Sequence, residues 1–374
     1  MEATVSERKP AELFPPGDMI KEELEARGWT QADLAEIMGR SPNDIVNLIS
    51  GKRSISPEIA KELAAAFGTS AELWINMESA YRLWVAEAPA DAIQRRAFLR
   101  EIAPYKDMGR RHWLELSDNI SVLEQRLMDY FGISRIDEPI AMPFYARKAT
   151  VDVSPAQRAW VFRAEHLSRA VPAAPYSSRS LESALSALKD LFASVSAVRH
   201  VPRILSEAGI RFLVVEQLTR AKIDGATFWL DPNSPVIALS LRYDRIDYFW
   251  YTLFHELGHV AHGDGCLDED IFGEGRAAGA DATEKEADRF AAEFLVSQRD
   301  IDDFIARNGP LYAGDKIRNF ARIRGIHPGI VVGQLQHRGE VPWTHFHVML
   351  EKVRHLVVQS TLTDGWGQVA PILS

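Results

Sequence analysis

Cysteine is nearly absent from this chain, because Cys266 is the only one among 374 residues. A single thiol excludes an internal disulfide, and such sparse cysteine is typical of proteins from a reducing compartment. No stretch approaches the ~20 consecutive apolar residues that a membrane helix needs, and the N-terminus lacks the apolar core of a signal peptide. We therefore expect a cytoplasmic protein without a membrane partner.

Internal repeats and low-complexity tracts are also absent, and there is no excess of basic residues. The net charge of −9 argues against broad, nonspecific adhesion to nucleic acids or membranes, although it leaves room for a local basic face. A chain of this length can bury sizeable cores and predicts two or three domains.

What the chain does contain is a run of apolar residues at helical spacing around residues 246–262, which predicts a largely buried helix. His255 and His259 lie four residues apart, so both imidazoles project from one face of that helix, with Glu256 beside them. This His-Glu-x-x-His pattern predicts a zinc ion (Zn2+) held by the two histidines. The glutamate would accept a proton from the water on the metal. The alternative is a buried helix that contains two histidines and no metal.

A second amphipathic helix is predicted over residues 284–296, and it offers a third zinc ligand. Glu284 and Asp288 are four residues apart and share a face, so Glu284 can bind the metal while Asp288 holds the outer nitrogen of a zinc-bound histidine. Three protein ligands leave a fourth position for water, as a catalytic site requires. Glu286 is the competing ligand, but it points elsewhere on the helix. The alternative for Glu284 is a solvent-exposed acid at the start of a helix, without a metal.

Residues 255–296, with the run before them, resemble the ImmA/IrrE family of zinc metallopeptidases. Members show a strand-rich lead-in, then His-Glu-x-x-His, then a helix beginning Glu-x-Glu-Ala-Asp/Asn-x-Phe-Ala, and this chain has these pieces in that order. Ser297 stands where a proline is common in the family. The resemblance implies a gluzincin-like peptidase that cuts a protein partner, often a transcriptional repressor.

Two further side chains near the zinc helix are weaker candidates for the metal site. His262 follows His259 by three residues, but we interpret it as a supporting or surface residue because the carboxylate already completes a three-ligand set. Cys266 could reach back as a redox switch, yet a plain small residue is the simpler interpretation. We expect the glycine-rich, acidic residues 262–281 to form a mobile loop at the mouth of the site.

The N-terminal part, residues 1–84, predicts five short helices. Ser41-Pro42 and Ser56-Pro57 place a cap before a proline at a helix start, while Thr30 with Asp33 and Thr69 with Glu72 form capping boxes. Two short helices joined by a glycine-bearing turn are typical of a DNA-binding helix-turn-helix. The stretch 30–53 resembles the Xre-type family, and residues 48–57 with 67–84 resemble the HigA-type antitoxins.

The resemblance implies that this domain binds double-stranded DNA at a palindromic operator as a homodimer. Asn43, Asp44 and Asn47 would face the major groove, and Gln31 would lie near a phosphate. The full set of expected DNA-contacting residues is Gln31, Ser41, Asn43, Asp44, Asn47, Lys52 and Arg53. Relatives often carry arginine at positions 42 and 47, where this chain has proline and asparagine, so we expect modest phosphate-driven affinity. The alternative is a small helical bundle used for protein contact.

The predicted fold is mainly α (α+β). It comprises the five-helix domain at 1–84, a helical connecting region at 85–200, the metallopeptidase domain at 201–340 and a C-terminal tail at 341–374. Alternating residues predict a small three-stranded antiparallel sheet before the zinc helix, with strands at 210–218, 227–230 and 235–241 and a turn at 222–226. An edge of this sheet could hold an extended peptide. Two functions remain open: a DNA-binding regulator whose endopeptidase domain cleaves a protein substrate, and a HigA-like antitoxin with a toxin partner and a structural or sensory zinc site.

Overall fold

The computed structural model describes residues 14–86, 91–142, 153–264, 266–269 and 282–364. The chain divides into two compact units, residues 1–93 and 94–374, and each is considered by itself. The four-part division expected from the sequence stays a prediction. Among the described residues, no helix has the length and apolar character needed to cross a membrane.

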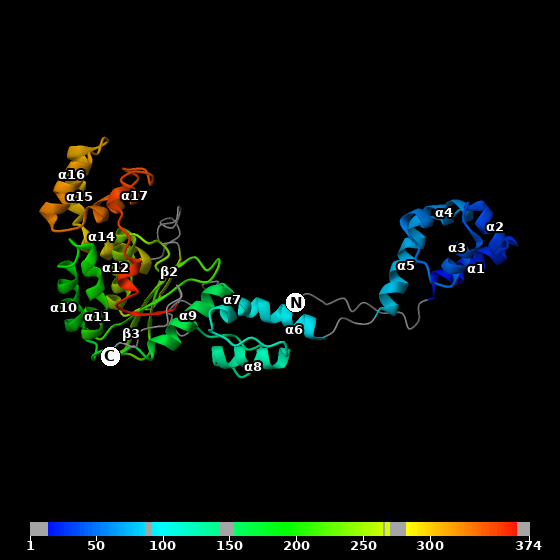
Figure 1. The fold of residues 1–374 in the computed structure, drawn as a ribbon, viewed down its shortest axis with the longest axis horizontal. Helices are drawn as coiled ribbons and strands as arrows, with labels where there is room; N and C mark the ends of the chain where they lie inside the picture. Colours follow the sequence, from blue (N-terminus) through cyan, green and yellow to red (C-terminus); the bar gives the residue numbers. More distant parts are fainter. Residues whose placement is uncertain (1–13, 87–90, 143–152, 265, 270–281, 365–374) are drawn as a thin grey trace. The chain divides into compact units, whose positions relative to one another are not determined.

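The first unit is a set of five short helices around one core (Figure 1). The core includes Ile20, Leu34, Ile45, Leu63 and Trp74, all fully buried. The helices are α1 (Pro16–Arg27), α2 (Gln31–Ile37), α3 (Pro42–Ile49), α4 (Pro57–Phe67) and α5 (Ala71–Val85).

Side-chain caps fix where these helices begin. Thr30 and Asp33 form a reciprocal capping box at α2, and Ser41 and Ser56 cap α3 and α4 ahead of their prolines. The expected cap of α5 was wrong by one residue: Ser70 accepts the hydrogen bond at the helix start. The hydroxyl of Thr69 instead accepts a hydrogen bond from the indole nitrogen of the buried Trp74, at 2.8 Å. The polar atom of a buried tryptophan needs such a partner.

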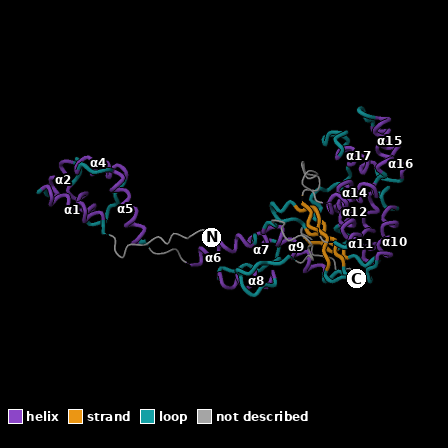
Figure 2. The backbone as a smooth tube through the Cα atoms, turned by 180° about the vertical axis from the view of Figure 1, so that it is seen from behind, coloured by secondary structure: helices purple, strands orange, loops and turns teal. Residues whose placement is uncertain are grey.

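The second unit combines helices with one sheet (Figure 2). Its first helices are α6 (Asp91–Ile102), which begins at the division between the units, α7 (Tyr105–Arg110), α8 (Ile120–Phe131), α9 (Pro155–Ser168), α10 (Ser178–Lys189) and α11 (Val201–Glu207). The later ones are α12 (Ile246–His262), α14 (Ala282–Leu295), α15 (Gln298–Asn308), α16 (Gly314–Arg324), α17 (Pro328–His337) and α18 (Arg354–Val357). Two 3-10 helices, η1 (Val195–His200) and η2 (His347–Met349), complete the set of described helices.

The sheet has five described strands in the order β4-β2-β3-β1-β5. They are β1 (Arg211–Val215), β2 (Ile223–Trp229), β3 (Pro235–Leu239), β4 (Cys266–Glu269) and β5 (Leu362–Asp364). Strand β2 runs antiparallel to β3 and β4, whereas β1 runs parallel to β3 and β5.

The expectation of three antiparallel strands was therefore wrong in detail, although the fold is mainly α with a small sheet, as predicted. Two successive reversals bring β3 back in the direction of β1, so these neighbours pair in parallel. Residues 222–226, expected to be a turn, lie mostly in β2, where a bulge between Ile223 and Gly225 accommodates the glycine. Strand β4 lies within the segment expected to be a loop, and β5 lies within the expected tail.

Both faces of the sheet are covered by helices (Figure 2). One face packs against α9 and the helices before it, and the other packs against α12. Side chains of β1 alternate between the two faces: Leu213 and Val215 pack on the α9 side, and Phe212 and Val214 pack on the α12 side. The sheet therefore supports one side of α12.

We expect Trp160→Phe to lower the free energy of unfolding of the second unit by about 1–3 kcal/mol. The fully buried Trp160 on α9 donates from its indole nitrogen to the carbonyl oxygen of Val215, at 2.9 Å, and phenylalanine removes that donor. Chemical denaturation measures the change. Trp343→Phe, at a tryptophan that is 41% exposed, is the matched control and should change stability by less than about 0.5 kcal/mol. Equal effects of the two variants would contradict the assigned role of this bond.

Candidate metal centre and helix-turn-helix face

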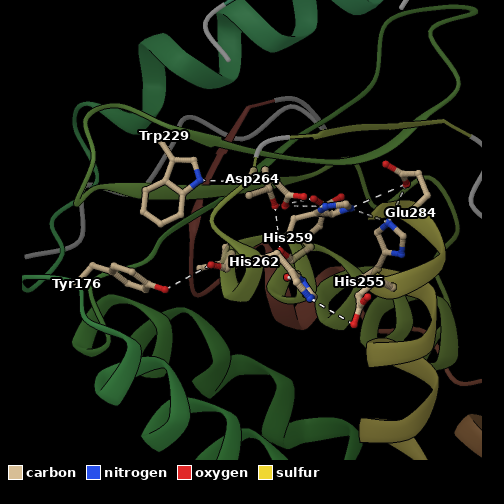
Figure 3. A network of polar contacts seen from close by, with 12 residues as sticks. Tyr176, Trp229, His255, His259, His262, Asp264 and Glu284 are labelled. Carbon is tan, nitrogen blue, oxygen red and sulfur yellow. Dashed lines mark hydrogen bonds and ion pairs between the residues drawn. The ribbon is translucent and has the colours of Figure 1, made fainter. Parts of the chain in front are cut away.

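The candidate metal centre lies where α12 and α14 cross at close range. Helix α12 is buried along residues 246–260, whereas α14 buries only Ala287, Ala291 and Leu295. A Cβ added to Gly258 would lie only 3.2 Å from the Cα of Ala287, so glycine allows this approach. The crossing brings the first turn of α14, with Glu284, beside the two histidines of α12 (Figure 3).

Three donor groups converge at this crossing: His255, His259 and Glu284. The two imidazole Nε2 atoms are 3.2 Å apart, and Oε2 of Glu284 lies 3.5 Å from His255 Nε2 and 3.9 Å from His259 Nε2. Tetrahedral zinc with bonds of ~2.0–2.2 Å places its donors about 3.3–3.6 Å apart. The donor spacing therefore fits a zinc ion, and the two histidines and the glutamate are among the residue types that zinc prefers.

Each histidine of the pair has a carboxylate on its other ring nitrogen. His255 Nδ1 lies 3.0 Å from Oδ1 of Asp288, which also accepts a hydrogen bond from the hydroxyl of Tyr251 at 3.2 Å. His259 Nδ1 lies 3.1 Å from Oδ1 of Asp264. A carboxylate in this position orients the ring and leaves Nε2 to face a metal.

Asp264 is in turn fixed by the sheet. The indole nitrogen of Trp229, the last residue of β2, donates to the main-chain oxygen of Asp264 at 3.1 Å (Figure 3). Tyr176 packs edge-on against that indole, with ring centroids 5.4 Å apart. The position of one histidine partner thus depends on β2 as well as on the end of α12.

Glu256 is fully buried and lies against β2. Its Oε2 accepts a hydrogen bond from the hydroxyl of Thr227 at 2.7 Å. Glu256 follows His255 on α12, so its buried carboxylate lies next to the histidine pair along the helix.

His262 and Glu286, the weaker candidates among the described side chains, contact groups other than the three donors. His262 Nδ1 is 2.6 Å from the carbonyl oxygen of Gly258, and its Nε2 faces Glu286 at 3.6 Å. Glu286 also pairs with Arg289. Of the two glutamates, Glu284 is therefore the one that faces His255 and His259. The backbone of Cys266 lies in β4, and the side chain lies outside the described part, as does most of the expected loop.

Sequence reasoning missed Asp264, Thr227 and Trp229. Asp264 follows the helix-ending Gly263, whose φ of 70° turns the chain back toward His259, so no periodicity marks it. Thr227 and Trp229 lie two residues apart on one face of β2, and that strand was expected to begin only at Thr227. The signal that could have found them is this alternation, had the strand been recognised from Ile223.

In the first unit, the residues expected to contact DNA lie on or beside α2 and α3. Gln31 is the exposed first residue of α2, and Asn43 is exposed near the start of α3. Asn47 is half-buried one turn later, and Lys52 is exposed after the helix. The hydroxyl of Ser41 accepts from the main-chain N–H of Asp44 at 3.2 Å, so it serves as the cap of α3.

Asp44 and Arg53 form an ion pair with each other on this surface. The hydroxyl of Ser41, followed by the guanidinium of Arg53, holds the pKa of the Asp44 carboxyl below its usual value. Arg53 can therefore reach a phosphate only by leaving Asp44, a small loss for an exposed pair. Val46 on α3, which the sequence did not mark as a candidate, is an apolar residue that is 47% exposed.

Comparison with known proteins gives one family match within each of the two units. Residues 20–74 match the helix-turn-helix family HTH_3, and residues 206–317 match the IrrE N-terminal-like domain of the family Peptidase_M78. The chain belongs to the helix-turn-helix family. It carries in addition an IrrE-like domain, whose matched range includes α12 and α14.

Three similar proteins each match about a quarter of this chain or less. An uncharacterized HTH-type transcriptional regulator, YddM of Escherichia coli K12, is 30% identical over 86 residues, which are 23% of this chain and 92% of that protein. Antitoxin HigA-1 of Vibrio cholerae is 41% identical over 80 residues, 21% of this chain and 72% of that protein. A solved addiction module antidote protein of the HigA family from Coxiella burnetii is 29% identical, with a TM-score of 0.20, over 25% of this chain and 97% of that chain.

We expect Asp264→Ala and Asp288→Ala each to weaken zinc binding about 10- to 100-fold, because each removes the carboxylate that orients one imidazole. Titration of zinc against a competing chelator measures the affinity. Asp315→Ala, at a carboxylate on α16 that is 98% exposed, is the matched control and should leave the affinity unchanged. Unaltered zinc affinity in both test variants would contradict the assigned roles.

Proposed function

We propose that the second unit is a zinc-dependent endopeptidase that cleaves a protein partner. The observation that carries the proposal is the convergence of His255, His259 and Glu284 beside the buried carboxylate of Glu256. The match to the Peptidase_M78 family supports it. The substrate class proposed is a protein such as a transcriptional repressor.

His255, His259 and Glu284 would hold the zinc ion, and Asp288 and Asp264 would keep the two imidazoles in their orientation. When bound, zinc would supply Lewis-acid polarisation of the scissile carbonyl and lower the pKa of a coordinated water toward neutrality.

Glu256 performs the proton transfers in this proposal. Its carboxylate takes the proton of the attacking water and later gives a proton to the leaving amine. Burial against β2 keeps bulk water from competing with the carboxylate for that proton.

Replacing Glu256 with glutamine should keep zinc binding and reduce peptide cleavage by at least about 10²-fold, because the amide cannot accept the proton. The measurement incubates the zinc-loaded chain with the proteins encoded by adjacent genes and follows their cleavage. Metal content, measured on the same samples, separates loss of the base from loss of zinc. Cleavage by the Glu256→Gln variant at the wild-type rate would refute this mechanism.

We propose that the first unit binds double-stranded DNA at a two-fold symmetric operator, as a homodimer. Two kinds of side chain on α3 suit base edges. The amides of Asn43 and Asn47 can pair with adenine, and the exposed Val46 can pack on a thymine methyl group. No arginine or lysine lies within α3, so the preferred half-site should be rich in A·T pairs.

Lys52→Gln and Asn43→Ala should separate the two kinds of DNA contact. Lys52→Gln should weaken binding to all sequences and reduce the slope of log K against log salt by about 0.9. Asn43→Ala should weaken only the preferred site, by about 1–3 kcal/mol, without changing the slope. Equilibrium binding to a duplex selected from a random library, and to a scrambled duplex, measures both. A uniform loss with Asn43→Ala would contradict base recognition by that residue.

A second function is favoured by the similarity to antitoxin HigA-1 over the first unit. In this case the chain is an antitoxin or autoregulatory repressor, its partner is a toxin, and the zinc site is structural or sensory. A stable complex with the product of a neighbouring toxin-sized gene, together with no cleavage of adjacent gene products, would support the antitoxin. Zinc-dependent loss of a neighbouring repressor under stress would support the peptidase.

A further inference from the structure

We propose that one face of β2 forms a cradle for Glu256, in which Gly225 and Thr227 hold the carboxylate in a single orientation beside the three metal-facing donors. Thr227 is then a positioning residue that acts through Glu256. The functional part of this inference rests on the proposed peptidase activity, whereas the contact itself can be tested without it.

The hydroxyl of Thr227 is the first component of the cradle. Thr227 is fully buried, and its Oγ1 lies 2.7 Å from Oε2 of Glu256 and 3.1 Å from the main-chain oxygen of the same residue. A hydroxyl has one proton to donate, and the bond to the carboxylate is the shorter of the two. Branching at Cβ restricts the χ1 angle of threonine in a strand, so the donor itself is held in place.

The missing side chain of Gly225 is the second component. A Cβ at this position would lie 2.1 Å from Oε1 of Glu256 and 2.9 Å from its Cδ. These distances are far inside van der Waals contact, so a side chain here would displace the carboxylate. Gly225 and Thr227 are two residues apart and share a face of the strand. The strand thus fits closely against one carboxylate oxygen and donates to the other.

The same face of β2 continues to Trp229, which fixes Asp264 and through it the ring of His259. Alternate residues of one strand therefore position both the proposed base and the partner of one proposed ligand. A displacement of about 1 Å between reacting groups costs on the order of 10²-fold in rate, so this alignment matters for the chemistry.

The first test uses Thr227→Val, which keeps the shape of the side chain and removes the donor. With a partner that the wild type cleaves, kcat should fall about 10- to 100-fold while KM changes less than about twofold, because Glu256 and not the substrate site is displaced. Zinc affinity should be unchanged, and Thr227→Ser should restore most of kcat. Gly225→Ala should reproduce the loss.

Thr361→Val is the matched control. Thr361 is equally buried, and its hydroxyl lies 3.1 Å from the carbonyl oxygen of Phe212, so the control also removes one buried hydrogen bond. It should leave kcat unchanged. Wild-type kcat in Thr227→Val, or a loss of kcat that follows a loss of zinc, would overturn the proposal.

The second test does not depend on cleavage. Thr227→Val should lower the melting temperature (Tm) of the wild type by roughly 2–4 °C, because a buried carboxylate loses a donor. In a Glu256→Ala background the same substitution should lower Tm by clearly less, because the hydroxyl then keeps only the main-chain oxygen of residue 256 as its acceptor. An equal loss in both backgrounds would overturn the cradle. If no partner is cleaved by the wild type, the proposed function fails. The comparison of Tm between the two backgrounds still tests whether Thr227 holds the Glu256 carboxylate.

Discussion

The close crossing of α12 and α14 is the contact on which the candidate metal centre depends. Two of the three donors belong to α12 and lie one helical turn apart, so the helix alone sets their spacing. The third donor, Glu284, comes from α14, whose backbone approaches α12 closely at Gly258. The sheet and the helices packed around α12 hold that helix in place. The distances between the three donors therefore depend on how α14 packs against α12.

The parts of this centre that could be predicted from sequence are those fixed within single helices. His255, His259, Glu284 and Asp288 follow helical spacing, and the structure brings all four side chains together. Asp264 lies beyond a left-handed turn, and Gly225 and Thr227 contact Glu256 across a strand–helix interface. Contacts of this kind depend on tertiary packing, which local spacing does not encode.

The difference between local and tertiary contacts also explains which parts of the fold could be predicted from the sequence. Capping residues predicted most helices of the first unit, because a cap acts within one turn of its helix. The sheet was harder, since β4 and β5 are short and pair with strands far away in sequence. A three-residue strand such as Leu362–Asp364 carries too few alternating positions to be distinguished from a loop.

The pairing of β5 with β1 bears on the order in which the molecule forms during synthesis. Residues 362–364 align with residues 213–215, so one edge of the sheet is closed by a segment made about 150 residues later. The first unit needs only contacts among its own short helices, so it can fold on the ribosome well before that segment emerges. A nascent chain would thus present a complete helix-turn-helix while the sheet beneath α12 still lacked its last strand.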